Sequence, residues 1–285
     1  KILKYRCRVI TRRADKLKEM LDRMAKDLAK IRKNKPLIHH ITNYVVMNET
    51  ANATLCIGAL PVMAPAKEEV EEMVVAAGAL LLNLGTLTPE LVDSMILAAK
   101  KANELGIPVV LDPVGAGATA LRTSASTRLF AETKVDIVRG NIAEICALIG
   151  RRAEIKGVEA LSDLEGAEEV AKEMSKTKGC TTAITGKIDI VSDGTRIALI
   201  ENGHSMLRTV SGTGCMATTI VAAFAAAEED RFLAATGGLI AFGIAGEKAA
   251  QISGPRPGTF HVCLYDALAE LREEELLSRA RVRFI

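Results

Sequence analysis

The sequence contains no tryptophan, and aromatic residues make up only 3% of its 285 positions. So few aromatic rings argue against the stacking platforms on which single-stranded nucleic acids are usually bound. Aliphatic residues must fill the core instead, and hydrophobic residues make up 49% of the chain. A core of this kind favours helices packed on a parallel sheet over an all-β sandwich.

The six cysteines lack the CxxC spacing of a zinc ribbon or a redox pair. Most of them have apolar neighbours in the sequence, as reduced core cysteines do. This pattern predicts a reducing, cytoplasmic compartment. The sequence also lacks an apolar run of about 18 residues and a hydrophobic signal core, so we expect no membrane partner.

Basic residues are concentrated at the start of the chain. Residues 1–35 carry 14 Lys or Arg and 4 Asp or Glu, a net charge of +10, and the other 250 residues carry 23 and 31, a net charge of −8. Such a cluster can contact nucleic acid, but its amphipathic pattern is also that of a solvated helix face. We predict a basic N-terminal extension over residues 1–14 and no nucleic-acid partner.

Helical and strand-like segments alternate along the rest of the chain. Helical spacing of apolar residues predicts an amphipathic helix over 15–33, and short apolar strands such as 78–84 and 108–111 flank a helix over 89–106. Apolar strands separated by helices are typical of a parallel sheet that is covered on both faces. We therefore predict one three-layer αβα domain over residues 15–285, with a mainly parallel central sheet.

Two segments near the C-terminus are expected to depart from this alternation. Strands over 188–192 and 195–200 are predicted to form a hairpin, because Asp193-Gly194 between them is typical of a tight turn. The amphipathic pattern over 264–279 predicts a single C-terminal helix.

The strongest local feature is the sequence SGTGC at residues 211–215, ahead of a predicted helix over 215–227. Gly212 and Gly214, which flank Thr213, let the backbone approach a ligand closely. Free N–H groups at a helix N-terminus favour an anion, such as a transferring phosphoryl group. The lysine and the spacing of a Walker A loop are missing. The alternative is a glycine-rich turn that only caps a buried helix.

Cys215 follows this loop, at a position from which a base can reach a bound hydroxyl group. A thiol at a helix N-terminus has a lowered pKa, so we expect its thiolate to be accessible near neutral pH. A general base contributes about 10²–10⁴-fold to a rate. We predict that Cys215 is a catalytic residue, with a structural cysteine as the alternative.

Acidic residues follow two of the predicted strands. Asp112 comes directly after the strand at 108–111, and Glu144 lies one helical turn after Asn141. Ligands of open α/β sheets bind beyond the carboxyl ends of the strands, and Mg²⁺ is often held by one or two carboxylates with water and phosphates. We predict that Glu144 and Asp112 hold Mg²⁺ through water. The alternative is structural: a turn cap at Asp112 and a helix start at Asn141 and Glu144.

Four further residues are candidates for polar contacts. Thr185 ends a predicted strand and can contact a nucleotide phosphate or ribose, and Arg122 follows a glycine-rich loop and can neutralise phosphate charge. His39 and His40 have no carboxylate partner in the spacing of a metal site. We expect the two histidines to shape a pocket or to hydrogen-bond the backbone.

Five ordered segments between residues 36 and 260 resemble the hydroxyethylthiazole kinase family, which has the ribokinase-like fold. They are HHITNYVVMNETANATLCIGALPVMA, LDPVGAGATALRTS, RGNIAEI, AITGKIDIVSDG and SGTGCMATTIVAAF. Residues 1–14 have no counterpart that can be assigned. The resemblance implies a ribokinase-like three-layer αβα sandwich and ATP-dependent, Mg²⁺-dependent phosphorylation of the alcohol of 4-methyl-5-(2-hydroxyethyl)thiazole, in thiamine salvage.

The resemblance also implies roles for particular residues. Met47 and Gly212 are expected to contact the thiazole, and Arg122 and Thr185 to contact ATP. Cys215 stands where ribokinase relatives more often carry an aspartate as base. The family further implies a homotrimer with active sites at the subunit interfaces.

Two other functions fit part of the pattern. Kinases of other vitamin-precursor alcohols, of hydroxymethylpyrimidine or pyridoxal type, usually have GTGD or GAGD in the loop, and Cys215 argues against them. A non-catalytic thiazole- or nucleotide-binding protein would bind its ligand without releasing ADP. The combination of Asp112, Asn141 and Glu144 with the glycine loop argues against such a protein.

Overall fold

The structure, a computed structural model, describes residues 2–151 and 164–285, with side chains described from residue 15 in the first part and from 166 in the second. The strands of these residues form one sheet in the order β2-β1-β3-β4-β5-β6-β7-β8-β9. Every neighbouring pair from β2 to β6 is parallel, and every pair from β6 to β9 is antiparallel. The strands are β1 (Leu37–Ile41), β2 (Leu60–Met63), β3 (Ala79–Asn83), β4 (Val109–Asp112), β5 (Ile137–Gly140), β6 (Thr181–Ile184), β7 (Asp189–Ser192), β8 (Ile197–Ile200) and β9 (Val282–Phe284).

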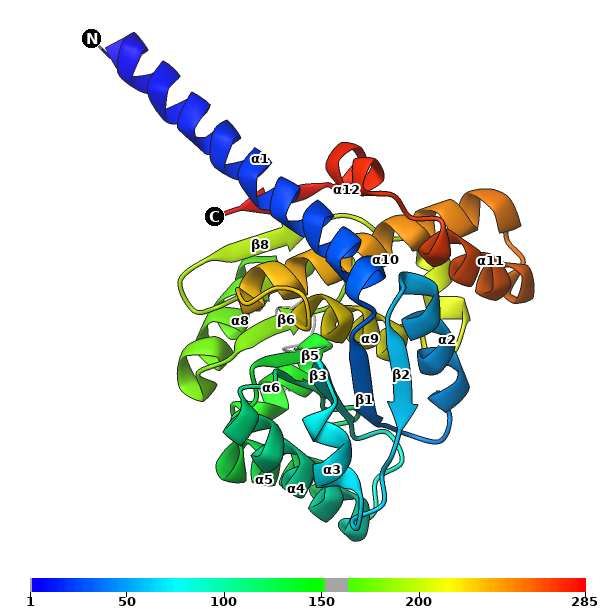
Figure 1. Cartoon of the computed structure of the whole chain (residues 1–285). Helices are drawn as coiled ribbons and strands as arrows, with labels where there is room; N and C mark the ends of the chain where they lie inside the picture. The colour runs from blue at the N-terminus through cyan, green and yellow to red at the C-terminus, as the bar shows by residue number, and fades with distance from the viewer. Residues whose placement is uncertain (1, 152–163) are drawn as a thin grey trace.

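Helices cover both faces of the sheet (Figure 1). They are α1 (Ile2–Asn34), α2 (Met47–Ile57), α3 (Val70–Val75), α4 (Pro89–Leu105), α5 (Ala120–Glu132), α6 (Ile142–Leu148), α8 (Leu164–Lys178), the 3-10 helix η1 (Ser205–Thr209), α9 (Thr213–Ala225), α10 (Arg231–Ser253), α11 (Pro257–Ala269) and α12 (Glu273–Arg279).

The alternation of side chains along each strand separates two apolar cores. In β3, Ala79 and Leu81 belong to the core with α1, α2, α9, α10 and α11, whereas Leu80 and Leu82 belong to the core with α3 to α6 and α8. Successive strand residues point to opposite faces, so a strand that is apolar throughout is buried on both. The predicted three-layer αβα architecture with a mainly parallel sheet is confirmed.

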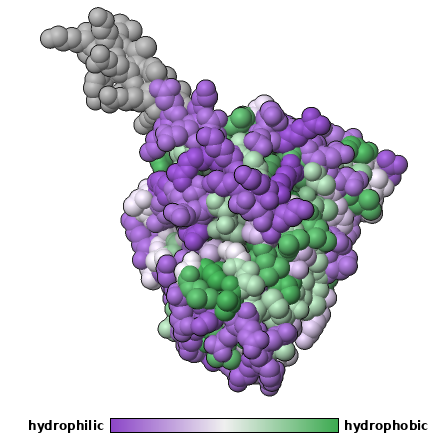
Figure 2. Space-filling view, in the orientation of Figure 1, coloured by the Kyte–Doolittle hydropathy of each residue, from purple (hydrophilic) through white to green (hydrophobic). Residues whose placement is uncertain are grey.

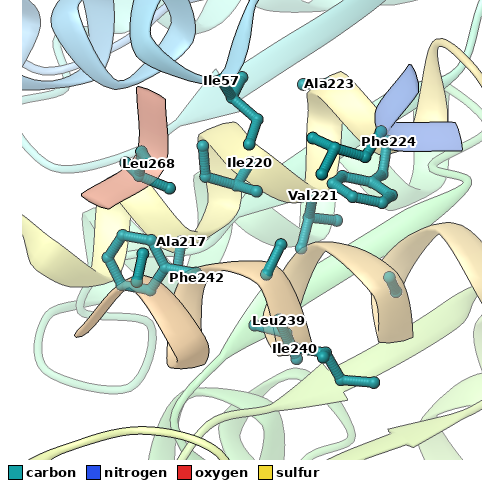
Figure 3. Close-up of a cluster of buried hydrophobic side chains, with 14 of the residues drawn as sticks. Ile57, Ala217, Ile220, Val221, Ala223, Phe224, Leu239, Ile240, Phe242 and Leu268 are labelled. Carbon is teal, nitrogen blue, oxygen red and sulfur yellow. The ribbon is translucent and has the colours of Figure 1, made fainter. Parts of the chain in front are cut away.

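Helices α9 and α10 pack closely at the centre of the first core (Figure 3). A Cβ atom at Gly238 would lie 2.8 Å from the Cα of Val221, so only glycine allows this approach. Side chains from both helices fill the space around the contact, among them Ile220, Val221, Phe224, Leu239, Ile240 and Phe242.

The predicted helix start at Asn141 and Glu144 and the predicted hairpin at Asp193-Gly194 are confirmed. The Thr88 side chain accepts a hydrogen bond from the Leu91 N–H with Pro89 at the start of α4, and Asn141 and Glu144 form a capping box. The β7–β8 pair is an antiparallel hairpin around Gly194.

The structure differs from the sequence predictions mainly at the two ends of the chain. Helix α1 begins at Ile2 and extends away from the sheet at its N-terminal end (Figure 1). The predicted single helix over 264–279 is wrong, because the chain turns between α11 and α12. The Glu275 carboxylate accepts a hydrogen bond from the Arg272 N–H and so starts a new helix there. The domain boundary after residue 14 stays a prediction.

Apolar side chains are also exposed on the surface. Figure 2 shows them over β2 and α2, where Leu60 and Leu55 are exposed. Among the described helices, none combines the length and the hydropathy needed to cross a membrane.

Candidate functional site

Polar side chains gather where the parallel strands end. Asn83 and Asp112 are the last residues of β3 and β4, and their Cα atoms are partners in the register of the sheet. Both side chains are buried. The N-terminus of α9 lies over this edge, because Cys215 contacts Asn83 and Gly214 lies close to Arg139. The position is the one expected for a ligand site in an open α/β sheet.

The glycine loop brings the start of α9 close to two other segments. Gly212 has a φ of +86°, and a Cβ atom on it would lie 2.8 Å from Cγ1 of Val46. A Cβ atom on Gly214 would lie 3.0 Å from Nη1 of Arg139. No side chain caps α9, so its first N–H groups remain available for an anion. Thr213 does not contribute its hydroxyl group, which donates to the Leu207 carbonyl at 2.5 Å.

The Cys215 sulfur atom accepts hydrogen bonds from two asparagine side chains. The Nδ2 of Asn83 lies 3.2 Å from Sγ, and the Nδ2 of Asn43 lies 3.8 Å from it. The pKa of Cys215 is raised to about 11, mainly because the thiol is buried and also because Asp112 is close. The Asn83 hydrogen bond and Arg139 oppose this rise but do not cancel it. The expectation of a lowered thiol pKa is therefore wrong, because burial and Asp112 outweigh the Asn83 hydrogen bond and Arg139.

Asp112 lies between a hydroxyl group and a guanidinium group. Its Oδ2 accepts a hydrogen bond from Thr218 at 2.7 Å and lies 3.7 Å from Nη1 of Arg139. The pKa of Asp112 is raised to about 6, because burial outweighs the stabilisation of the carboxylate by Arg139 and Thr218, and Glu144 raises it further. A divalent cation near the two carboxylates would offset this cost.

Glu144 fixes the loop that follows β4. Its Oε1 accepts the Gly115 N–H and its Oε2 accepts the Asn141 N–H, both at 2.8 Å. The structural role considered for Asn141 and Glu144 is thus present. Each carboxylate oxygen can accept a further bond, so Glu144 is also suited to hold a hydrated metal ion. The described residues form no cluster of three or more metal-ligating side chains, and magnesium sites that include substrate phosphates need only one or two carboxylates.

Arg139, which the sequence analysis did not single out, lies at the centre of the site. Its Nη2 donates to the Thr185 hydroxyl group at 2.5 Å, and its Nε is buried without a hydrogen-bond partner. The sequence signal was available: Arg139 directly follows the buried Ile137-Val138 of β5, at the edge where ligands bind. Successive side chains of β5 point to opposite faces of the sheet, and the Arg139 side chain points to the face where α9 starts.

Arg122 has a different environment. Its guanidinium group donates to the carbonyl groups of Leu84, Val114 and Gly85, at 2.7, 2.8 and 2.5 Å. These bonds join the loops that follow β3 and β4. Arg122 is not among the residues that line the cavity described below, so the structure gives it a role in shaping the loops.

A cavity of about 830 Å³ opens beside the start of α9. Its lining includes the basic side chains of Arg139, Lys187 and Arg208, the polar residue Thr185, and the apolar side chains of Leu239 and Phe242. The complete lining is Arg139, Asn141, Thr185, Gly186, Lys187, Asp189, Asn202, Gly203, His204, Ser205, Leu207, Arg208, Thr213, Gly214, Ala217, Leu239, Phe242 and Gly243. A lining with both basic and apolar side chains suits a ligand with a phosphate chain and a planar base.

The remaining predicted residues lie outside the lining of this cavity, on β1 and at the start of α2. Met47 is half-buried at the start of α2 and follows Val46, which Gly212 approaches. His39 and His40 are buried in β1, and their rings contact the Ala64 carbonyl group at 2.8 Å and the Thr54 hydroxyl group at 3.2 Å. Burial lowers the pKa of both histidines, that of His40 to about 3. The expected backbone hydrogen bond is confirmed at His39.

Comparisons with known proteins show the family of this chain. The family model described as "Hydroxyethylthiazole kinase family" matches residues 28–274. A hydroxyethylthiazole kinase of Chloroflexus aggregans is 52% identical over 262 residues, which cover 92% of this chain and 94% of that protein. The enzyme of the same name from Thermoanaerobacter pseudethanolicus is 51% identical, with 92% of this chain and 100% of that protein covered.

Solved structures give the same result. The hydroxyethylthiazole kinase protein of Pyrococcus horikoshii OT3 superposes with a TM-score of 0.85 at 44% identity, over 92% of this chain and 98% of that chain. Bacillus subtilis pyridoxal kinase in its ADP complex shares the fold at a TM-score of 0.56 and 15% identity, over 74% of this chain and 91% of that chain. The matches that cover 92% of this chain are with hydroxyethylthiazole kinases, and the pyridoxal kinase shares only the fold. The chain belongs to the hydroxyethylthiazole kinase family.

Proposed function

We propose that this chain transfers the γ-phosphoryl group of ATP to the hydroxyl group of 4-methyl-5-(2-hydroxyethyl)thiazole, a step of thiamine salvage. The observation that carries this proposal is the position of the uncapped N-terminus of α9. It lies between a basic cavity on one side and the buried polar groups around Cys215 on the other.

The nucleotide is proposed to bind in the cavity, with its phosphates beside Arg139 and the start of α9. Arg139, with Thr185 as its hydrogen-bond partner, would contact the phosphates and stabilise the charge that develops on the transferring group. We assign this role to Arg139 in place of Arg122, because the Arg122 guanidinium group is already bound to three carbonyl groups. The first N–H groups of α9, from Thr213 to Cys215, would bind the same phosphoryl group.

Mg²⁺ is proposed as the cofactor, with Glu144 and Asp112 holding it through water. When bound, the ion would neutralise charge on the phosphates during transfer. Asp112 supports this assignment because burial, with a further contribution from Glu144, raises its pKa, and a bound cation would offset that cost.

The thiazole is proposed to bind beside Met47 and Gly212, on the side of α9 that faces α2. Its hydroxyl group would be aligned in line with the γ-phosphoryl group near Cys215. Because the pKa of Cys215 is about 11, its thiol is neutral at pH 7 and is a weak proton acceptor. The rate would then come mainly from alignment and charge stabilisation, which phosphoryl transfer allows.

We also propose a homotrimer with active sites at its interfaces and a cytoplasmic location. Support for the trimer comes from Tyr44 and Val45, which are 67% and 62% exposed in the segment that leads to Met47. Large apolar side chains exposed next to a substrate site are typical of a surface that a partner covers. The five cysteines with described side chains are free thiols, as in a reducing compartment.

A coupled assay for ADP formation tests the proposed function. The purified chain is given ATP and Mg²⁺ with the thiazole alcohol, with hydroxymethylpyrimidine, with pyridoxal, or without an acceptor. ADP formation should require the thiazole alcohol. Preference for another alcohol would reassign the substrate, and binding of ATP and thiazole without ADP release would make the chain a binding protein.

A further inference from the structure

Asn83 is a buried polar residue for which the proposed mechanism has no role. It ends β3 next to Asp112, and its exposed fraction is only 1%. A buried amide group is costly unless its polar atoms are hydrogen-bonded. The hydrogen bonds of the Asn83 side chain therefore indicate its role.

The orientation of the Asn83 side chain is fixed by the backbone. Its Oδ1 accepts the Gly85 N–H at 3.0 Å, and an N–H group can only donate, so the oxygen atom must face Gly85. The same Oδ1 accepts the Nδ2 of Asn43 at 2.7 Å. The remaining Nδ2 of Asn83 then faces Cys215 Sγ, at 3.2 Å.

Asn43 is fixed in the same way. Its Oδ1 accepts the Val45 N–H at 3.1 Å, which leaves its Nδ2 to face both Asn83 and the sulfur atom. The N–H groups of two oriented amides thus converge on Cys215. The sulfur atom is held as an acceptor, and its own proton must point away from both asparagines.

We propose that Asn83 is a positioning residue of the phosphoryl-transfer site: its amide group, fixed by Gly85 and Asn43, holds the Cys215 sulfur atom in place against the substrate hydroxyl group. This inference rests on the proposed function for its kinetic consequences. The contact between Asn83 and Cys215 can be tested without a substrate.

The kinetic test is a double-mutant cycle between Asn83→Leu and Cys215→Ala. Leucine has nearly the shape of asparagine but cannot donate to sulfur. Asn83→Leu should lower kcat by about 10–100-fold and change the KM for ATP by less than about twofold, because alignment and not nucleotide binding is lost. In the Cys215→Ala background the same substitution should change kcat by less than about threefold, because residues that act through each other are not additive.

The test without substrate is alkylation of Cys215 by iodoacetamide at pH 9, followed by peptide mapping. Asn83→Leu should slow the alkylation of Cys215 by about tenfold, because the thiolate loses a hydrogen-bond donor. Thr236→Ala is the matched control: it removes a buried hydroxyl group that donates to the Phe232 carbonyl in α10, and it should leave both readouts unchanged. Asn83→Ala replaces Asn83→Leu if the leucine variant does not fold.

The proposal is overturned if Asn83→Leu lowers kcat equally with and without the Cys215 thiol, or if the alkylation rate of Cys215 does not change. Absence of thiazole kinase activity in the unmodified protein would reject the proposed function instead. The alkylation rates would then still decide whether Asn83 holds the sulfur atom.

Discussion

Gly212 and Val46 approach each other so closely that a Cβ atom on the glycine would lie 2.8 Å from Cγ1 of Val46. The contact joins the start of α9 to the start of α2, and Gly212 reaches it with a φ of +86°. A side chain at this position would therefore have to push the two segments apart, in addition to adopting a strained backbone.

Gly212→Ala should lower kcat/KM for the thiazole alcohol by at least about tenfold, because displacement of α9 by a fraction of an ångström misaligns the reacting groups. Gly106→Ala is the matched control. Gly106 has a φ of +70° and nothing within 4 Å of a Cβ atom, so this variant has the backbone strain without the contact. It should lose about 1 kcal/mol of stability and keep its activity. Equal activity in both variants would contradict the prediction.

Separate replacement of Arg139 and Arg122 by methionine should distinguish a residue needed for catalysis from a residue needed for loop structure. Arg139→Met should lower kcat/KM for ATP by at least about 100-fold, because a buried donor to the phosphates is lost. Arg122→Met should instead lower the free energy of unfolding by about 1–3 kcal/mol, because three carbonyl groups lose their donor. Steady-state kinetics and urea denaturation of both variants check this. The opposite pattern would return the ATP contact to Arg122.

Cys215→Ala should reduce kcat by less than about 100-fold, a smaller loss than removal of an effective general base causes. The reason is the raised pKa of the thiol, about 11, which leaves it protonated at pH 7. The pH dependence of kcat between pH 6 and pH 9 should be the same in the variant and the unmodified protein, since this thiol does not titrate in that range. A loss of about 10⁴-fold together with a changed pH profile would establish Cys215 as the base.

The stability of the contact between α1 and the α9–α10 turn should depend on pH through Asp27. Asp27 is fully buried, and its pKa is raised to about 6, mainly by burial and also by the nearby Glu228 carboxylate. An unfolded aspartate titrates near pH 4. Below that pH both states are protonated, and above pH 6 the folded state must hold a buried charge. The contribution of Asp27 to the free energy of unfolding therefore falls as pH rises from 4 to 6.

Asp27→Asn should accordingly stabilise the protein by about 2 kcal/mol at pH 7.5, and the gain should disappear near pH 4. The lost pair with Lys30 costs little because Lys30 is half-exposed. Thermal denaturation at the two pH values measures the effect, with Asp15→Asn, an exposed position on the same helix, as the control. A destabilised Asp27→Asn variant at pH 7.5 would contradict this interpretation.

The parts of the molecule that follow local rules could be predicted from the sequence. The apolar strands, the capping box of Asn141 and the glycine turn before Cys215 each depend on a few neighbouring residues. The architecture followed from these elements because few arrangements bury strands that are apolar on both faces.

The electrostatics of the site could not be predicted in the same way. The pKa of Cys215 depends on Asp112 and Asn83, which are more than 100 positions away in the sequence and become neighbours only when the strands align. The partners of Arg122 are likewise set by where three carbonyl groups lie after folding. Helix propensity also gave no sign of the turn before α12, where Leu271 is buried and Glu275 binds the backbone.

Strand β9, formed by residues 282–284, protects the edge of β8 from pairing with another molecule. It covers β8, whose four residues are all buried, with Arg283 on its outer side. Without it, β8 would offer a row of free peptide groups and apolar side chains, which is a template for intermolecular aggregation. Proteolytic removal of β9, or a fusion tag that displaces it, would thus lower the solubility of the protein before it lowers the catalytic rate.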